Sequence, residues 1–296
     1  MKKAAPLLAT LACYLIWGLQ PLYWALLADF SSLFILCVRI LMSMVFTWGY
    51  LLCAGRGREI VAAFKSAALM KLFAPAAVLL LFDWGLFILA VTGGRVLDAT
   101  LGYYMNPMII FLAGVFLFRE KGDAMEYAAV ALACIGVVVS TVSYGSFPAF
   151  ALLFAFFWPA YATVTKFAKA DPIVSIAVET ALMAPFALLG AALLCRGEGG
   201  LATVSWGSVP LLMGSGLVTA LPMILYTFVV NDLPFKVVGI LQYAGTTINL
   251  LCGVLFLGEK MTGSKLVLFA FIWLGLIVFT AGSFRRQRKA KAAAIK

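Results

Sequence analysis

The stretch GVFLFREK, at residues 114–121, returns almost unchanged as GVLFLGEK at residues 253–260. Four of the eight positions are identical, three exchange Phe and Leu, and one pairs Arg119 with Gly258. The offset of 139 residues is close to half of the 296-residue chain. A match at half the chain length indicates that the protein contains two copies of one structural unit.

The composition places both copies in a membrane. Hydrophobic residues make up 65% of the chain and charged residues 11%, against roughly 45–50% and about 25% in soluble domains. Apolar runs of about 20 residues follow one another, and each is long enough to cross the hydrocarbon core as a helix. The runs are continuous and do not alternate, which argues against membrane strands. We therefore expect an all-α integral membrane protein with ten transmembrane helices. The expected helices span residues 5–27, 33–53, 71–91, 97–118, 125–143, 147–167, 173–195, 207–230, 234–257 and 264–284.

The distribution of basic residues predicts the orientation of these helices. With the N-terminus inside, seventeen Lys and Arg residues fall in cytoplasmic segments, and only Arg95, Arg196, Lys260 and Lys265 fall in outer loops. This positive-inside bias predicts that both termini are cytoplasmic. The basic tail, residues 285–296, is expected on the anionic inner leaflet, so the net charge of +10 does not indicate nucleic-acid binding. The first run is too long for a signal-peptide core and is expected to stay in the mature protein.

Ten helices divide into two five-helix repeats, residues 1–145 and 146–284, followed by the tail. A five-helix unit that begins inside ends outside, so its copy runs upside down. Inverted repeats are the usual architecture of alternating-access carriers, because two such halves can exchange shapes and open a central site to either side. Weaker correspondences at nearly the same offset are Trp17 with Trp158, Arg39 with Glu179, Asp83 with Pro222, and Tyr104 with Tyr243.

Further motifs occur in a fixed order along the chain. They are WGLQPLYW at 17–24, Arg39, LGYYMNP at 101–107, ET at 179–180, TALP at 219–222 and GILQY at 239–243. In these motifs the chain resembles RarD, a branch of the EamA proteins in the drug/metabolite transporter superfamily. The resemblance covers nearly the whole chain and implies a ten-helix carrier of the bacterial inner membrane, of a type usually labelled a chloramphenicol-sensitivity permease. One departure is Asp83 before Trp84, where the family commonly has Asn, and it changes the charge balance of the expected site.

Three ionisable residues, Arg39, Asp83 and Glu179, lie well inside apolar runs. Each costs roughly 2.5–3.5 kcal/mol on membrane-insertion scales, so a function is expected for at least one of them. With one positive and two negative charges, one carboxylate has no cationic partner among the three residues. We expect Glu179 to pair with Arg39, and Asp83, nearer the midplane, to take up and release a proton. A structural ion pair between the second and seventh helices, a bound cation, or a cationic substrate group are the alternatives.

Polar and aromatic residues within the runs complete the expected substrate site. Gln242, Thr246 and Asn249 share one face of the predicted ninth helix, and Tyr103 and Asn106 lie on the fourth. Polar groups in hydrocarbon face the bundle interior or a cavity, and interhelical hydrogen bonding is an equally open interpretation. Central tryptophans are the expected cavity walls. The expected substrate-binding residues are Trp17, Arg39, Asp83, Trp84, Tyr103, Asn106, Trp158, Tyr161, Glu179, Tyr226, Gln242, Thr246 and Asn249.

No cofactor or metal is expected. The six cysteines form no CxxC pair and the chain has no histidine, which argues against a zinc site, a disulfide scaffold or a histidine-dependent enzyme. No nucleotide-binding motif occurs, so ATP is not the expected direct energy source. We expect a secondary active transporter, a permease or exporter of small metabolites or drugs, driven by protons. An uncoupled facilitator for amino-acid-like or amphipathic solutes and, less favoured, a membrane scaffold are the alternatives. The expected partners are a small-molecule substrate, protons and membrane lipids, with no nucleic acid; a homodimer is left open.

Overall fold

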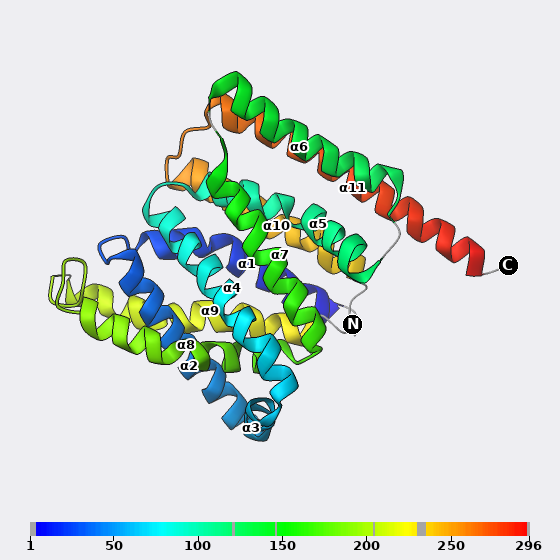
Figure 1. Ribbon diagram of the computed structural model, residues 1–296. Coiled ribbons are helices and arrows are strands. Elements are labelled where there is room, and N and C mark those ends of the chain that lie inside the picture. Colours follow the sequence, from blue (N-terminus) through cyan, green and yellow to red (C-terminus); the bar gives the residue numbers. More distant parts are fainter. Residues whose placement is uncertain (1–3, 120–121, 146, 204, 230–234, 295–296) are drawn as a thin grey trace. The chain divides into compact units, whose positions relative to one another are not determined.

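The computed structural model describes residues 4–119, 122–145, 147–203, 205–229 and 235–294, and it contains helices and no strand in these ranges (Figure 1). The helices are α1 Ala4–Ala25, α2 Ser32–Cys53, α3 Gly57–Lys65, α4 Ala67–Thr92, α5 Val96–Phe118, α6 Ala124–Tyr144, α7 Ala149–Ala168, α8 Pro172–Leu194, α9 Val209–Val229, α10 Phe235–Leu251 and α11 Gly263–Ala294. A 3₁₀ turn, Trp206–Ser208, precedes α9, and a π-helical segment, Cys252–Phe256, follows α10.

Among the residues whose side chains the structure describes, eight helices are long and apolar enough to cross a membrane. They are α2, α4 to α9, and α11. This confirms the expected all-α membrane protein. In α1 and α10 part of the side chains lie outside the described residues, and a shorter apolar stretch, Tyr243–Phe256, covers the end of α10 and the π-helical segment. The number of ten spans therefore stays a prediction.

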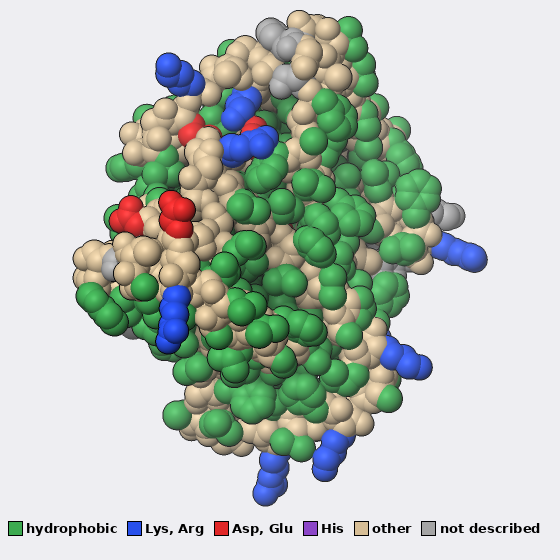
Figure 2. Space-filling view, turned by 60° about the vertical axis from the view of Figure 1, so that its left-hand side comes forward, with side chains coloured by type: hydrophobic (Ala, Val, Ile, Leu, Met, Phe, Trp, Pro, Cys, Tyr) green, Lys and Arg blue, Asp and Glu red, His purple; other side chains and the backbone are tan. Residues whose placement is uncertain are grey.

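The outer surface carries the apolar side chains that such spans need. Phe116 on α5 and Phe186 on α8 are largely exposed, as are many leucines on other helices. On the face drawn in Figure 2, hydrophobic side chains predominate and Lys and Arg are few. A soluble protein rarely exposes apolar patches of this extent, whereas lipid tails solvate them.

Side chains at the loops set where several helices begin. Ser31 accepts a hydrogen bond from a backbone N–H in the first turn of α2, and Asp171 accepts two from the first turn of α8. Asp123 and Glu126 form a reciprocal capping box at the start of α6. Each cap satisfies N–H groups that have no partner inside their own helix.

The helix α3 differs from the sequence expectation, which leaves this segment as a loop. It is nine residues long, too short for a span, but Ile60 and Ala63 lie one turn apart and are both buried. Ser66 ends α3 and accepts a hydrogen bond from the backbone of Leu69, so it also starts α4. As a result α4 begins at Ala67, four residues before its predicted start.

The repeated stretches at residues 114–121 and 253–260 have a similar backbone conformation at the one position where the residue types differ most. Arg119 and Gly258 both have positive φ, 54° and 68°. A positive φ is common for glycine and unusual for other residues, so the same left-handed turn is held in both places in spite of the different residue type. In the second copy the turn follows the π-helical segment, in which Leu257 N donates to Cys252 O at 3.0 Å.

The chain forms two compact units, unit 1 (Met1–Val96 with Val164–Gly258) and unit 2 (Leu97–Thr163 with Glu259–Lys296). Each predicted five-helix repeat contributes helices to both units. The units follow helix packing, whereas the repeats follow the sequence. The division into two repeats stays a prediction.

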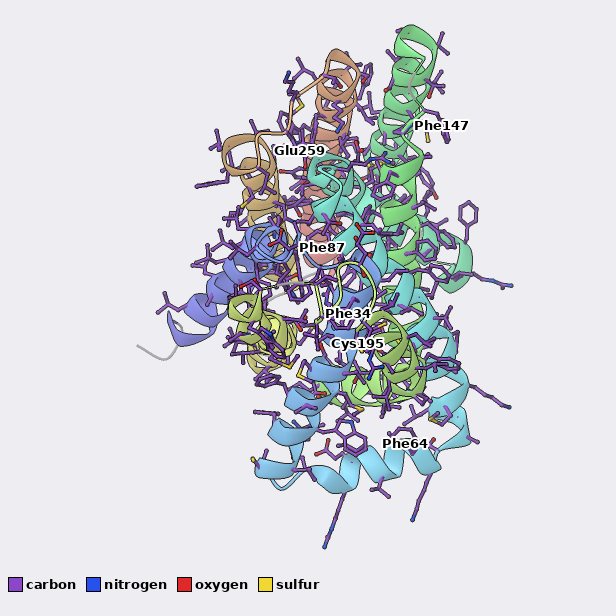
Figure 3. All side chains as sticks on the ribbon, turned by 90° about the vertical axis from the view of Figure 1, so that its left-hand side faces the viewer. Phe34, Phe64, Phe87, Phe147, Cys195 and Glu259 are labelled. Carbon is purple, nitrogen blue, oxygen red and sulfur yellow. The ribbon has the colours of Figure 1, made fainter. Side chains whose placement is uncertain are left out.

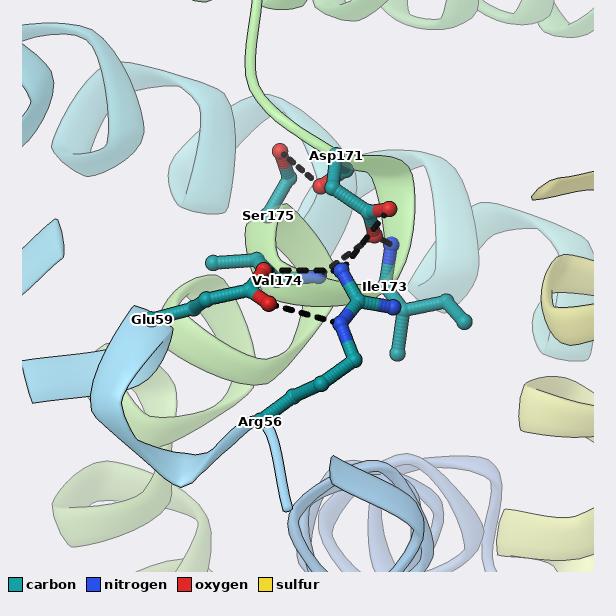
Figure 4. A network of polar contacts seen from close by, with 6 residues as sticks. All are labelled: Arg56, Glu59, Asp171, Ile173, Val174 and Ser175. Atoms are coloured by element: carbon teal, nitrogen blue, oxygen red, sulfur yellow. Dashed lines mark hydrogen bonds and ion pairs between the residues drawn. The ribbon is translucent and has the colours of Figure 1, made fainter. Parts of the chain in front are cut away.

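Within unit 1, α2 packs along α8 in the antiparallel direction. At one end Ser31 N donates to Gly199 O at 2.9 Å, and at the other Arg56 contacts Asp171 (Figure 4). Figure 3 shows Phe34 and Cys195 at the first end and Phe64 at the opposite end. In the same unit α1 packs against α9 and α10, and α4 packs against α2 and α8.

Within unit 2, α6 lies side by side with α11, which continues beyond it toward the C-terminus (Figure 1). Glycines permit this close antiparallel packing: a Cβ at Gly136 would lie 2.7 Å from Phe271 Cβ, and one at Gly282 would lie 2.8 Å from Met125 Cβ. A Cβ at Gly102 of α5 would lie 2.4 Å from the backbone of α7. Small residues at such positions let membrane helices approach closely.

Candidate functional site

The three predicted membrane charges are all buried in unit 1. Arg39 on α2 is 3% exposed, Asp83 on α4 is 2% exposed, and Glu179 on α8 is fully buried. The helices that carry them pack against one another in every combination. The expected pairing of Arg39 with Glu179 and the roles of the three residues stay predictions.

Arg39 contacts two aromatic rings. Its guanidinium carbon lies 4.2 Å from the ring centroid of Trp84 and 4.7 Å from that of Trp24. Its Nε donates to the hydroxyl of Thr219 at 3.1 Å, and this hydroxyl donates to Ser215 O at 2.9 Å. Stacking on π faces and a directed Nε–H bond are properties of arginine that lysine lacks. The four helices α1, α2, α4 and α9 thus meet at one cation.

The sequence predicts Trp84 at this site but not Trp24 or Thr219. Both lie in motifs that carry the family resemblance, Trp24 at the end of WGLQPLYW and Thr219 at the start of TALP. Their positions in apolar runs give no sign of a partner, because a contact with Arg39 depends on which helices pack together.

Two buried hydroxyls lie next to this site at the crossing of α2 and α9. A Cβ at Gly216 would lie 2.3 Å from the backbone of Met42, so the two helices touch there. Ser43 and Ser215, each adjacent to this contact, are fully buried, and their hydroxyls have no hydrogen-bond partner in the described part of the chain. A buried hydroxyl in a helix usually donates to the backbone carbonyl four residues earlier, as the Thr47 hydroxyl does to Ser43 O. Unused buried hydroxyls suit a bound water or a polar group of a ligand.

The predicted polar face of the ninth helix is buried where α10 meets α1. Thr246 and Asn249 are both buried, and the Oδ1 of Asn249 has no hydrogen-bond partner among the described residues. A Cβ at Gly18 would lie 2.9 Å from Gly245 O, so the two helices are in backbone contact. Trp17, one turn after Tyr14, is partly buried with its ring 5.6 Å from that of Tyr14. The side chains of the two other predicted residues, Tyr226 and Gln242, lie outside the described residues.

The four remaining predicted residues lie in unit 2. Asn106 of α5 is buried, with an Oδ1 that has no hydrogen-bond partner in the described ranges. Tyr103 of α5 packs its ring 5.2 Å from that of Phe154 on α7. Trp158 and Tyr161, also on α7, have ring centroids 5.7 Å apart. These residues lie on α5 and α7 of unit 2, and the three charged residues lie in unit 1.

The repeated Glu-Lys dipeptide has a structural role in its second copy. Glu259 (labelled in Figure 3) accepts a hydrogen bond from Leu97 N at 3.0 Å, at the start of α5. Beside it Lys265 forms an ion pair with Asp98 at 3.1 Å. A carboxylate at this place satisfies a backbone donor of the first helical turn and favours the positive end of the helix dipole. The first-copy dipeptide, Glu120-Lys121, lies outside the described residues.

Metal-ligand clusters and the described surface pocket give no further residues for the expected site within the described ranges. No group of three or more Cys, Asp or Glu side chains in the described ranges could hold a metal ion. A surface pocket of about 340 Å³ is lined by Asp29, Glu198, Gly199, Thr203 and Ser205, none of which is an expected site residue. The candidate site therefore rests on the buried polar residues of the helices.

Comparison with known proteins places these observations in a family. Residues 147–281 match the EamA-like transporter family. The chain is 35% identical over 287 residues to the uncharacterized transporter YojE of Bacillus subtilis, with 96% of each chain covered. It is 34% identical over 285 residues to the protein RarD of Salmonella typhimurium, with 95% of this chain and 96% of the relative covered. A protein of solved crystal structure shares the fold, with a TM-score of 0.60 at 17% identity over 94% of this chain and 98% of that one.

Proposed function

The chain belongs to the EamA transporter family as a RarD-like protein, and on this premise we propose that it moves small metabolites or drugs by proton-coupled alternating access. Family membership and the apolar helices make it a multi-pass bacterial membrane transporter. The names of family and relatives point to transport and away from catalysis. Proton coupling, alternating access and the roles of single residues go beyond this membership.

Helix packing supports the inverted repeats that alternating access needs. The predicted second and seventh helices correspond to α2 and α8, which pack together in unit 1. The predicted fifth and tenth correspond to α6 and α11, which pack together in unit 2. Each pair joins one helix with its proposed copy in the antiparallel direction, as a two-fold axis in the membrane plane requires. The shared left-handed turn at Arg119 and Gly258 also supports a duplicated unit.

The observation that carries the proposal is the burial of three charges in unit 1. Arg39, Asp83 and Glu179 lie on three mutually packed helices of a membrane protein. Ionisable groups in such places are costly and mark substrate or proton pathways. We assign substrate binding to Arg39 and its tryptophans, with Glu179 as the counter-charge of Arg39. The remaining carboxylate, Asp83, then binds and releases the coupling proton.

Flux in proteoliposomes tests this assignment. A thermal-shift screen of amino acids, nucleosides and antibiotics first identifies a solute that stabilises the purified protein. Under an imposed pH gradient, Asp83→Asn is expected to lose accumulation of that solute, because the proton-binding group is gone. It should retain counterflow, which needs binding and alternating access but no proton gradient. Asp29→Asn, which removes an exposed carboxylate from a loop, is the matched control and should accumulate the solute normally.

The same experiment separates the proposal from its closest alternative. Gradient-driven accumulation by Asp83→Asn at the wild-type level would remove Asp83 from proton coupling and leave Glu179 as the candidate. Wild-type flux that ignores the pH gradient altogether would indicate an uncoupled facilitator. An absence of counterflow for every solute that binds would argue against transport through this site.

A further inference from the structure

The helix α3 has one face packed on the protein and an adjoining face that is partly exposed. Ile60 and Ala63 are buried in a hydrophobic cluster with residues of α2, α4 and α8, including Phe73 and Ile173. On the adjoining face Val61 is 53% exposed and Phe64 is 37% exposed. Because α3 follows the end of α2 and precedes the start of α4, it lies where two spanning helices leave the bilayer.

Basic residues border the exposed apolar pair. Arg58, Val61 and Lys65 are spaced i, i+3 and i+7 and therefore share one side of the helix. Arg58 and Lys65 are both exposed, and so is Lys71 in the following helix. A short helix with apolar side chains beside lysine and arginine is typical of elements that lie in a membrane interface.

The acidic groups beside α3 do not cancel this charge, because Glu59 and Asp171 share Arg56, and Arg58, Lys65 and Lys71 leave a positive surplus (Figure 4). Arg56 donates from Nε and Nη2 to the two carboxylate oxygens of Glu59, both at 2.7 Å. It also reaches Asp171 at 3.0 Å, the residue that caps α8. These bonds lower the pKa of Glu59 and raise that of Arg56, so both stay charged at neutral pH. The network ties α3 to α8 and fixes which face of α3 points outward.

We propose that α3 is an interfacial anchor that binds anionic phospholipid, with Val61 and Phe64 among the upper acyl chains and Arg58 and Lys65 on the headgroup phosphates. The charge surplus selects an anionic headgroup over a zwitterionic one. The apolar pair selects a lipid surface over a soluble acidic partner. This binding site is separate from the buried charges and does not depend on the identity of the transported solute.

Lipid-dependent stability tests the anchor. The purified chain is placed in phosphatidylcholine nanodiscs with or without phosphatidylglycerol, and its thermal unfolding is followed. Wild type is expected to unfold at a higher temperature with phosphatidylglycerol, and to lose this gain in about 1 M salt, where the Debye length is about 3 Å. Each basic residue removed is expected to weaken phosphatidylglycerol binding about five-fold, the equivalent of about 1 kcal/mol. Native mass spectrometry of retained phosphatidylglycerol gives this affinity directly.

Three variants with matched controls make the test specific. Arg58→Gln with Lys65→Gln should lose most of the phosphatidylglycerol-dependent gain, and Phe64→Gln should lose part of it. Arg58→Lys should keep it, because a phosphate contact needs charge more than shape. Arg196→Gln with Lys260→Gln removes two equally exposed charges from loops and should retain the wild-type gain. Unfolding of every variant in detergent should stay close to wild type, since the changed side chains lie outside the core.

Two results would overturn the anchor. One is a lipid dependence that does not single out α3. The Arg58→Gln, Lys65→Gln variant would then keep the wild-type phosphatidylglycerol gain, or the loop control would lose as much of it, which would indicate an effect of total charge alone. The other is a change in the monomer–dimer ratio of the α3 variants that is the same in both lipids. That outcome would assign the exposed face of α3 to a second copy of the chain.

Discussion

Arg39 makes contacts that another cation cannot reproduce. Its planar guanidinium lies against Trp24 and Trp84, and its Nε binds Thr219. A cation over an aromatic face contributes about 0.5–2 kcal/mol, with the larger values at desolvated sites. The positive charge of Arg39 and the planar shape of its guanidinium therefore contribute separately to stability. A substitution that keeps the charge and changes the shape can distinguish the two contributions.

Arg39→Lys is expected to lower the free energy of unfolding by about 1–3 kcal/mol, because the stacked contacts and the Nε bond are lost while the charge remains. It should also weaken the thermal shift given by a transported solute. Arg196→Lys, at an exposed position, is the matched control and should leave both values unchanged. Thermal unfolding with and without solute measures the two effects. Wild-type stability in Arg39→Lys would show that the tryptophan contacts contribute little.

At the scale of elements, the junction of α2, α3 and α8 has a defined dependence on pH. The folded-state pKa of Glu59 lies below its usual value of 4.5 because Arg56 binds both of its carboxylate oxygens. The stability from this contact is therefore present above about pH 4.5 and is lost as the pH falls through the lower, folded-state pKa. Because Glu59 is largely exposed, the contact contributes less than about 1 kcal/mol.

Arg56→Gln is expected to lower the unfolding temperature at pH 7 and to lower it progressively less as the pH falls below about 4.5. The substitution removes the partner of Glu59, and the stability that this contact provides is lost in acid as the pH falls through the lowered folded-state pKa of Glu59. Glu198→Gln in a loop is the control. The measurement is thermal unfolding of the detergent-solubilised protein across pH 3 to 7. An effect of equal size at both ends of this range would exclude the ion pair as its cause.

The sequence predicts the long apolar helices better than the short or irregular ones. The apolar runs predict the membrane spans of α2, α4 to α9 and α11, because a membrane-spanning helix needs a continuous apolar stretch. The helix α11 itself continues to Ala294, beyond its predicted end at residue 284. The sequence does not indicate the π-helical turn at Cys252–Phe256, which no residue type marks. The helix α3 also goes unpredicted, because its apolar residues are few and their partners lie on other helices.

At the scale of the whole molecule, the positive-inside bias and the odd number of helices per repeat predict which loops share a side. Cysteine at position 58 or 124 should react only from the cytoplasmic side, and cysteine at 198 only from outside. These positions are exposed, whereas the neighbouring Gly199 is unsuitable, because its φ is +71° and a Cβ would lie 2.5 Å from Ser31 N.

Labelling with a membrane-impermeant thiol reagent in cells and in inverted vesicles measures this topology. The background is the chain with Cys53 and Cys134 replaced by serine, because both are exposed free thiols. Reaction of positions 58 and 198 from the same side would contradict the ten-helix inverted arrangement. Reaction of 58 and 124 from opposite sides would contradict the predicted first repeat.

The sequence by itself determined the properties that depend on local composition. Hydrophobic length decides that the chain enters a membrane, and the high cost of a charge in hydrocarbon marks Arg39, Asp83 and Glu179 as buried and functional candidates. The order of short motifs indicates the EamA family. None of these conclusions requires knowledge of which helix is next to which.

The tertiary structure alone decided which residues meet. Most helices here are apolar on every side, so no polar stripe shows which face turns toward which neighbour. Trp24 therefore becomes a partner of Arg39 only when α1 packs beside α9, which itself packs against α2. Ser43 and Ser215 become buried hydroxyls only at the crossing beside Gly216. Helix pairing depends on shape complementarity between distant segments, and this is why the sequence indicated the charges of the site and Trp84 but not Trp24 and Thr219.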